Sequence, residues 1–134
     1  MRDPLRIEVP IAVAVGGALG AVARWAIATN VEPTSGFPVA TFAANISGAF
    51  VLGVVLVLGE RFHPTHHKAW ARLWRPFLAT GVLGGYTTFS TLALETVRLP
   101  VDMAVTYVVA SVVVGLAAYA VGNGITRRVT GIVA

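Results

Sequence analysis

An eight-residue polar run interrupts an apolar segment of the chain, and no catalytic grouping accompanies it. From Phe77 to Leu94 there is no charged residue, yet the centre of this segment reads Gly84-Gly85-Tyr86-Thr87-Thr88-Phe89-Ser90-Thr91. In lipid every backbone N–H and C=O group must be satisfied within the protein, so a loosened helix is tolerated only where it faces protein or a watery cavity. The sequence contains no Ser-His-Asp grouping and no phosphate loop, which disfavours an enzyme. The run therefore predicts a functional site that handles a ligand without a catalytic cycle.

Asn45 is a lone amide in the middle of another apolar segment, with Thr41 and Gly48 on the same helix face. An amide without a hydrogen-bond partner is costly in hydrocarbon, so this side chain must meet another helix or water. Two interpretations stay open. Asn45 either makes an interhelical hydrogen bond or lines a pore and donates an N–H to an anion.

Further side chains could contribute to an anion pathway. The ring of Phe89 has a positive edge, so an edge facing a narrow pore would attract an anion, although ordinary packing is the alternative. Tyr107, Ser111 and Gly115 follow at intervals of four, which aligns two hydroxyl groups on one helix face. They predict either a polar track or interhelical hydrogen bonds. Arg24 either reaches the lipid headgroups or supplies a vestibule charge that concentrates anions.

The composition indicates an all-α membrane protein with one domain over residues 1–134. Hydrophobic residues make up 56% of the chain and charged residues only 12%, about half the usual charged fraction of a soluble domain. Four spans are predicted at residues 9–28, 37–59, 77–97 and 103–124, each near the ~20 residues that a bilayer requires. The connections are short, which predicts an up-down-up-down bundle whose third helix is broken near its centre.

The Lys and Arg residues predict how the chain is oriented in the cell membrane. Positive residues favour the cytoplasmic side, and this bias accounts for the basic pI without a nucleic-acid partner. Of the ten Lys and Arg residues, only Arg24 and Arg98 fall on the opposite side. We therefore expect a multi-pass protein of the plasma or inner membrane with both termini in the cytoplasm. The eight cytoplasmic residues are Arg2, Arg6, Arg61, Lys68, Arg72, Arg75, Arg127 and Arg128.

Other features point to packing or to solvated loops. The pairs Gly16/Gly20 and Gly81/Gly85 have the small-xxx-small spacing that lets helices approach closely in lipid. A histidine cluster in the second loop is more typical of a solvated loop than of a metal site. The acidic residues are expected at the periphery of the spans, which disfavours a proton-coupled exporter because that class needs an acid inside the membrane. The histidines are His63, His66 and His67, and the acids include Glu32, Glu60, Glu95 and Asp102.

Three strings together resemble the Fluc/CrcB family of fluoride channels. The first is Gly16-Gly17-Ala18-Leu19-Gly20-Ala21 followed by Arg24-Trp25, and the second is Thr41-Phe42-Ala43-Ala44-Asn45-Ile46-Ser47-Gly48-Ala49-Phe50. The third and most specific is Gly81-Val82-Leu83 leading into the polar run Gly84–Thr91, with Glu95 following. The resemblance covers all four spans.

The resemblance implies a fluoride-selective channel subunit that exports fluoride passively and so gives fluoride resistance. Family members are antiparallel dimers with two pores and a structural sodium ion at the centre. By position, the backbone carbonyls of Gly84 and Thr87 would bind the sodium, and Arg24 would lie at the vestibule. The residues that would line the pore are Asn45, Phe89, Ser90, Thr91, Tyr107 and Ser111.

Two departures from the family pattern favour a heterodimer with an oppositely inserted homologous subunit. The family usually has a second Phe three residues after the first, where this chain has Leu92. A chain that inserts both ways should also have balanced Lys and Arg, whereas this one is strongly biased. The alternatives are a non-conducting partner or assembly subunit and, less favoured, a small four-helix multidrug exporter.

Overall fold

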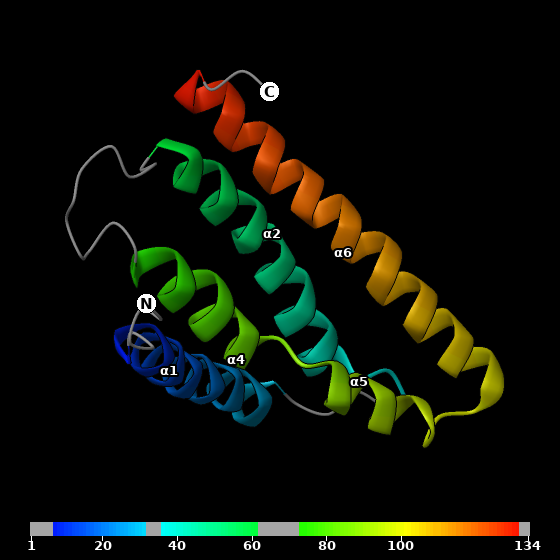
Figure 1. Cartoon of the computed structure of the whole chain (residues 1–134). Helices are drawn as coiled ribbons and strands as arrows, with labels where there is room; N and C mark the ends of the chain where they lie inside the picture. The colour runs from blue at the N-terminus through cyan, green and yellow to red at the C-terminus, as the bar shows by residue number, and fades with distance from the viewer. Residues whose placement is uncertain (1–6, 32–35, 62–72, 132–134) are drawn as a thin grey trace, which may run out of the picture.

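Helices form all the regular structure among residues 7–31, 36–61 and 73–131, which are the residues that the computed structural model describes. In chain order they are α1 (Glu8–Asn30), α2 (Val39–Arg61), η1 (Pro76–Leu83), α4 (Gly84–Tyr86), α5 (Phe89–Thr96) and α6 (Val101–Thr130). They make four segments long and apolar enough to cross a membrane, the third running over Leu73–Thr96. The predicted all-α membrane architecture is confirmed, and the third span is broken between α4 and α5 (Figure 1).

The first span packs against the first half of the third span, and glycines make this possible. A Cβ atom at Gly20 would overlap the carbonyl oxygen of Val82, and a Cβ at Gly85 would overlap that of Gly17. At Gly81, a Cβ would lie only 3.0 Å from the Cα atom of Gly16. The predicted small-residue pairs therefore face each other across one interface, where the two backbones are in direct contact.

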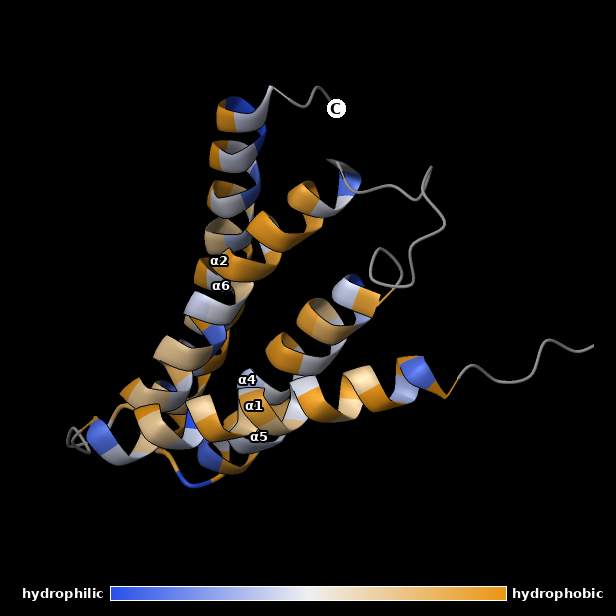
Figure 2. Ribbon diagram, turned by 90° about the vertical axis from the view of Figure 1, so that its left-hand side faces the viewer, coloured by the Kyte–Doolittle hydropathy of each residue, from blue (hydrophilic) through white to orange (hydrophobic). Residues whose placement is uncertain are grey.

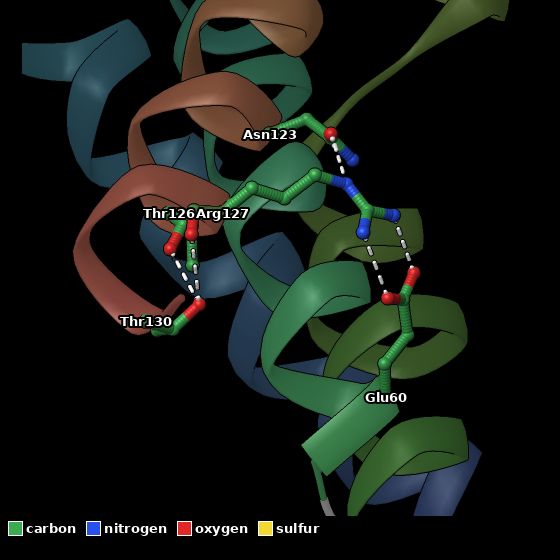
Figure 3. A network of polar contacts seen from close by, with 5 residues as sticks. All are labelled: Glu60, Asn123, Thr126, Arg127 and Thr130. Carbon is green, nitrogen blue, oxygen red and sulfur yellow. Dashed lines mark hydrogen bonds and ion pairs between the residues drawn. The ribbon is translucent and has the colours of Figure 1, made fainter. Parts of the chain in front are cut away.

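The second and fourth spans form another close pair (Figure 1). A Cβ at Gly53 of α2 would lie 2.8 Å from the backbone nitrogen of Asn123, and a Cβ at Gly122 of α6 would overlap the carbonyl of Phe50. At the far end of this pair Arg127 donates two hydrogen bonds to the carboxylate of Glu60, at 2.7 and 3.0 Å, and its Nε donates to Asn123 Oδ1 (Figure 3). Glycine contacts along the helices and an ion pair at their ends thus hold α2 and α6 together.

The two helix pairs meet at one end of the molecule and diverge toward the other, where α1 begins and α6 ends (Figure 2). A small apolar core joins them, in which Trp74 and Leu83 of the third span pack with Val55 of α2. Large apolar side chains elsewhere point outward, as in Leu19, Val105 and Leu116, each more than half exposed. Such an exterior suits lipid as the surrounding solvent.

The last helix is longer than its predicted span, which ended at residue 124. It begins directly after Pro100 and ends at Gly131, whose φ of 67° is left-handed, a conformation that glycine adopts without strain at a helix C-terminus. Arg127 and Arg128 lie in its last turn, where cations interact favourably with the helix dipole. The onset of charge marks where α6 leaves the apolar layer, and the helix itself continues past it.

Candidate functional site

The break in the third span is made by threonines. Thr87 and Thr88 are both extended, with ψ angles of 159° and 119°. Gly84 is helical, with φ −65° and ψ −35°, and Gly85 lies within α4. The break therefore lies inside the predicted polar run, after its glycines. Gly85 serves close packing against α1, and the chain leaves the helix two residues later.

Side chains from two other helices bind the backbone at this break. The N–H of Thr88 donates to Asn45 Oδ1 at 2.8 Å, and Asn45 Nδ2 donates to the carbonyl of Thr88 at 3.1 Å. From α1, Arg24 Nε donates to the carbonyl of Gly85 at 3.2 Å. The interhelical interpretation of Asn45 is thus correct for two of its hydrogen-bonding groups, and one amide hydrogen remains available to another acceptor.

The second half of the third span starts with its own cap. The hydroxyl oxygen of Thr88 accepts a hydrogen bond from the N–H of Thr91 at 3.1 Å and donates to the hydroxyl of Thr91 at 3.0 Å. The hydroxyl of Ser90 lies 3.2 Å from the same oxygen. Threonine is a favoured N-cap because its oxygen satisfies an otherwise unpaired N–H. The hydroxyls of the polar run therefore belong to one local network at the start of α5.

Because of these hydrogen bonds, the backbone carbonyls of Gly84 and Thr87 do not receive the N–H groups that would normally bond to them in a helix. In an uninterrupted α-helix the N–H of Thr88 would bond to the carbonyl of Gly84, and the N–H of Thr91 to that of Thr87. Here Asn45 takes the first N–H and the hydroxyl of Thr88 takes the second. Backbone carbonyls without an N–H partner are good ligands for a hard cation. The carbonyls of Gly84 and Thr87 therefore lack the N–H partners that a continuous helix would give them.

Three cavities meet around the break. The vestibule, of about 380 Å³, lies between the end of α1, the start of α2 and α5, and its charged lining residues are Arg24, Glu95 and Arg98. The break cavity, of about 440 Å³, is lined by Asn45, Gly84, Thr87, Thr88, Phe89 and Leu92 among others. The α6 groove, of about 490 Å³, runs from Asn45 past Ser111 and Gly115 to Tyr119.

The cavities share lining residues. Thr88 lines both the vestibule and the break cavity. Asn45, Ala49 and Leu52 line both the break cavity and the α6 groove. The two polar residues among them, Thr88 and Asn45, are joined directly by their paired hydrogen bonds. Polar residues therefore line each of the three adjoining cavities, from the vestibule through the break to the α6 groove.

Glu95 lies one residue from the end of the third span, as expected, and is half-buried between helices. Its carboxylate accepts a hydrogen bond from the hydroxyl of Thr41 on α2 at 2.8 Å and another from the hydroxyl of Tyr107 on α6 at 2.7 Å. Tyr107 is fully buried, and its ring packs edge-on against Phe37. Sequence reasoning missed this cluster, although Thr41 lies one turn before Asn45 on the same helix face and so marked a polar stripe there.

Of the remaining predicted site residues, Phe89 and Thr91 lie beside the break and Ser111 lies on α6. Phe89 borders the break cavity and is 82% exposed, while Thr91 lines the vestibule beside Arg24. Ser111 is buried and donates its hydroxyl to the carbonyl of Tyr107, and its side of α6 lines the groove. The histidine cluster at residues 63–67 lies outside the described residues.

Fold and site together define a small multi-pass membrane protein built around an interrupted helix. A family model described as "CrcB-like protein, Camphor Resistance (CrcB)" matches residues 11–123. The "Fluoride-specific ion channel FluC 2" of Nocardia farcinica is 40% identical over 96% of this chain and 91% of its own length. The "Fluoride-specific ion channel FluC 1" of Streptomyces coelicolor is 39% identical over 96% of the chain and 84% of its own length. The "Fluoride-specific ion channel FluC 3" of Streptomyces avermitilis is 45% identical over 94% of the chain, which spans only 62% of that relative.

The chain belongs to the CrcB family, because the family model covers most of its length and the Nocardia relative matches nearly end to end.

Proposed function

We propose that this protein is a subunit of a fluoride-selective channel through which fluoride leaves the cell passively. The observation that carries the proposal is the similarity, over nearly the whole chain, to curated relatives named fluoride-specific ion channels. The polar residues that line the cavities from the vestibule to α6 are a second support. Fluoride is strongly hydrated, so a pore for it must replace water with hydrogen-bond donors, and diffusion down a gradient needs no catalytic group.

In this proposal the pore runs along the connected cavities. Arg24 attracts the anion to the vestibule, where Thr91 presents its hydroxyl. Ser90 presents its hydroxyl beside that of Thr88 at the break. Asn45 offers its remaining amide hydrogen, and Phe89 offers the positive edge of its ring. Ser111 continues the pathway along the α6 groove, and the buried Tyr107 holds the vestibule residue Glu95 through its hydroxyl.

A sodium ion bound at the break would have a structural role. The carbonyls of Gly84 and Thr87 have lost their usual N–H partners and border one cavity, so they fit a hard cation. When bound there, the cation would supply a positive charge that offsets carbonyl dipoles in a layer without free water. Related carbonyls from a second subunit would complete the ligand set.

We further propose that the second subunit is a homologous chain in the opposite orientation, forming an antiparallel heterodimer. Leu92 lines the break cavity where the family usually has a second ring, so a homodimer would lack that ring in each pore. The Lys and Arg bias predicts one fixed orientation with cytoplasmic termini. The numbers in the relatives' names, FluC 1, 2 and 3, are consistent with several such proteins in one organism.

Leu92 also favours the second candidate, a partner subunit that assembles a pore without conducting alone. The exporter alternative stays disfavoured, because the half-buried Glu95 lies one residue from the end of the third span and not near its middle. The relatives are also named as channels and not as exporters.

Growth in fluoride tests the proposed function. Cells without their own fluoride exporter should regain growth in fluoride medium when this chain is expressed together with an oppositely inserted homologue. The chain alone should rescue weakly or not at all. Full rescue by the chain alone would contradict the heterodimer, and failure of both combinations would contradict channel function.

Cysteine labelling tests the fixed orientation. The chain contains no cysteine, so Val129→Cys creates a single thiol at a residue that is 82% exposed at the end of α6. An impermeant maleimide should label it in inside-out vesicles and leave it unlabelled in intact cells. Equal labelling from both sides would show dual insertion and would favour a homodimer.

A further inference from the structure

We propose that Asn45 is a positioning residue that keeps the third span open and thereby leaves the Gly84 carbonyl free for a cation. Through this one amide the anion pathway and the cation site depend on each other. The inference rests on the proposed function, because it assumes that the Gly84 and Thr87 carbonyls bind sodium.

At the break, the side chain of Asn45 competes with a backbone carbonyl for the N–H of Thr88. Its Oδ1 accepts the N–H of Thr88 at 2.8 Å. In a continuous helix that same N–H would bond to the carbonyl of Gly84, four residues earlier. The side chain of Asn45 and the carbonyl of Gly84 are therefore alternative acceptors for one hydrogen, and Asn45 holds it.

The second hydrogen bond makes the contact rigid. Asn45 Nδ2 donates to the carbonyl of Thr88 at 3.1 Å, so the amide spans both backbone groups of one residue. Thr88 has φ −150° and ψ 119°, and this extended conformation presents both groups to α2. A two-point contact of this kind fixes the extended backbone more strongly than either bond alone.

The neighbouring contacts bring α2 close enough for this pairing. A Cβ at Gly48, one turn after Asn45 on the same face, would overlap the side chain of Thr87. Ser47 lies 2.8 Å from the hydroxyl of Tyr86 through its Oγ atom. The helix face that carries Asn45 is thus in direct contact with residues on either side of the point where α4 ends.

Removal of the Asn45 amide would change which acceptor the backbone N–H of Thr88 bonds to. Thr88 would then have an N–H without its acceptor, and a protein in lipid does not tolerate an unsatisfied backbone group. If Thr88 turns into the helix, its N–H bonds to the carbonyl of Gly84 and is satisfied. This closure would remove the Gly84 carbonyl from the cation site and would displace Phe89, the next residue, from the break cavity.

Two substitutions of Asn45 separate its positioning role from a role in lining the pore. Asn45→Ala removes the acceptor and should close the break. Asn45→Asp keeps an oxygen that accepts the Thr88 N–H, so the break should stay open although the added charge opposes fluoride passage. Ser111→Ala is the matched control, because Ser111 shares the α6 groove with Asn45 and makes its hydrogen bond to the carbonyl of Tyr107 instead. It should lower fluoride flux without closing the break.

The test uses the full-length protein, purified with whatever subunit it assembles with, and two measurements. The first is the rise in Tm when sodium replaces choline. The second is the ¹³Cα chemical shift of Thr87 and Thr88, which distinguishes extended from helical backbone. We expect a sodium-dependent rise and extended shifts for the wild type, Asn45→Asp and Ser111→Ala. For Asn45→Ala we expect helical shifts and no sodium-dependent rise.

The outcomes separate the positioning role of Asn45 from the proposed sodium site on which it rests. Extended shifts in Asn45→Ala would overturn the positioning part of Asn45, whatever sodium does. A retained sodium response in Asn45→Ala would overturn the link between the amide and the cation. A wild type that does not respond to sodium would overturn both the cation site and that link, while the threonine shifts would still decide whether Asn45 holds the break open.

Discussion

Gly20→Ala should prevent the first span from packing on the third and should abolish fluoride transport. A Cβ at this position would overlap the carbonyl of Val82 and lie 2.7 Å from the backbone nitrogen of Tyr86. Both neighbours are backbone atoms of a helix, so neither can move aside as a flexible side chain would. Overpacking typically costs about 1–3 kcal/mol and occasionally more, and a rigid contact belongs at the upper end. The measurement is the Tm of the purified protein, together with fluoride efflux from vesicles.

Gly17→Ala is the matched control on the same helix. The nearest atom to a Cβ there would be the carbonyl oxygen of Gly81 at 3.9 Å, an ordinary contact distance. Alanine also favours the helix over glycine by about 1 kcal/mol, so stability should stay level or rise. If Gly20→Ala retained wild-type Tm and transport, α1 could not lie against the third span as the structure has it.

Glu95→Ala should destabilise the bundle and strongly lower fluoride flux. The substitution leaves the hydroxyls of Thr41 and Tyr107 without their acceptor, and these residues are 8% and 0% exposed. A buried polar group left unsatisfied costs about 1–3 kcal/mol. The loss of these contacts from α5 to α2 and α6 should also displace the helices that border the proposed pathway. Thermal unfolding measures the first effect, and efflux measures the second.

Two further variants show whether the lost hydrogen bonds cause the loss. Tyr107→Phe removes only the hydroxyl, so adding it to Glu95→Ala should cost less than adding it to the wild type, as expected of residues that interact directly. Asp102→Asn changes an exposed acid in the first turn of α6 and should leave Tm and efflux close to wild type. Additive costs for Glu95 and Tyr107 would contradict the hydrogen-bonded cluster.

The four spans and their packing faces could be predicted from the sequence because both depend on local patterns. Long apolar segments mark the spans, and glycines four residues apart mark the surfaces where helices touch. Gly16, Gly20, Gly81 and Gly85 all lie in the interface between the first and third spans. The broken third span was also predictable, since seven of the eight residues in Gly84–Thr91 are polar or small and, within an apolar segment, need protein or water around them.

The position of the break was not predictable, because distant residues decide it. Whether the helix opens at the glycines or at Thr87 and Thr88 depends on which backbone groups find partners elsewhere. Asn45 is 43 residues from Thr88, and Arg24 is 61 residues from Gly85. The residues next to Gly84 in sequence do not indicate that Asn45 and Arg24 will bind the backbone there.

The same reason explains why the hydrogen bonds of Glu95 were not predictable. Its neighbours in sequence include the exposed Leu94 and the valine and arginine that follow, which suggests a span end facing solvent. Its hydrogen-bond partners come from α2 and α6. The burial of a lone carboxylate is decided by such partners, and they become visible only when the helices are placed together.

Simultaneous recording of two anions tests the central claim most directly. Vesicles containing the channel, assembled from this chain and its partner, are loaded with equal potassium fluoride and potassium chloride, and valinomycin carries the potassium. Fluoride and chloride electrodes then follow efflux into a medium without either anion and without a pH gradient. The account predicts rapid release of fluoride while chloride stays inside. Chloride leaving at a comparable rate, or fluoride leaving only when a proton gradient is applied, would contradict a passive fluoride-selective channel.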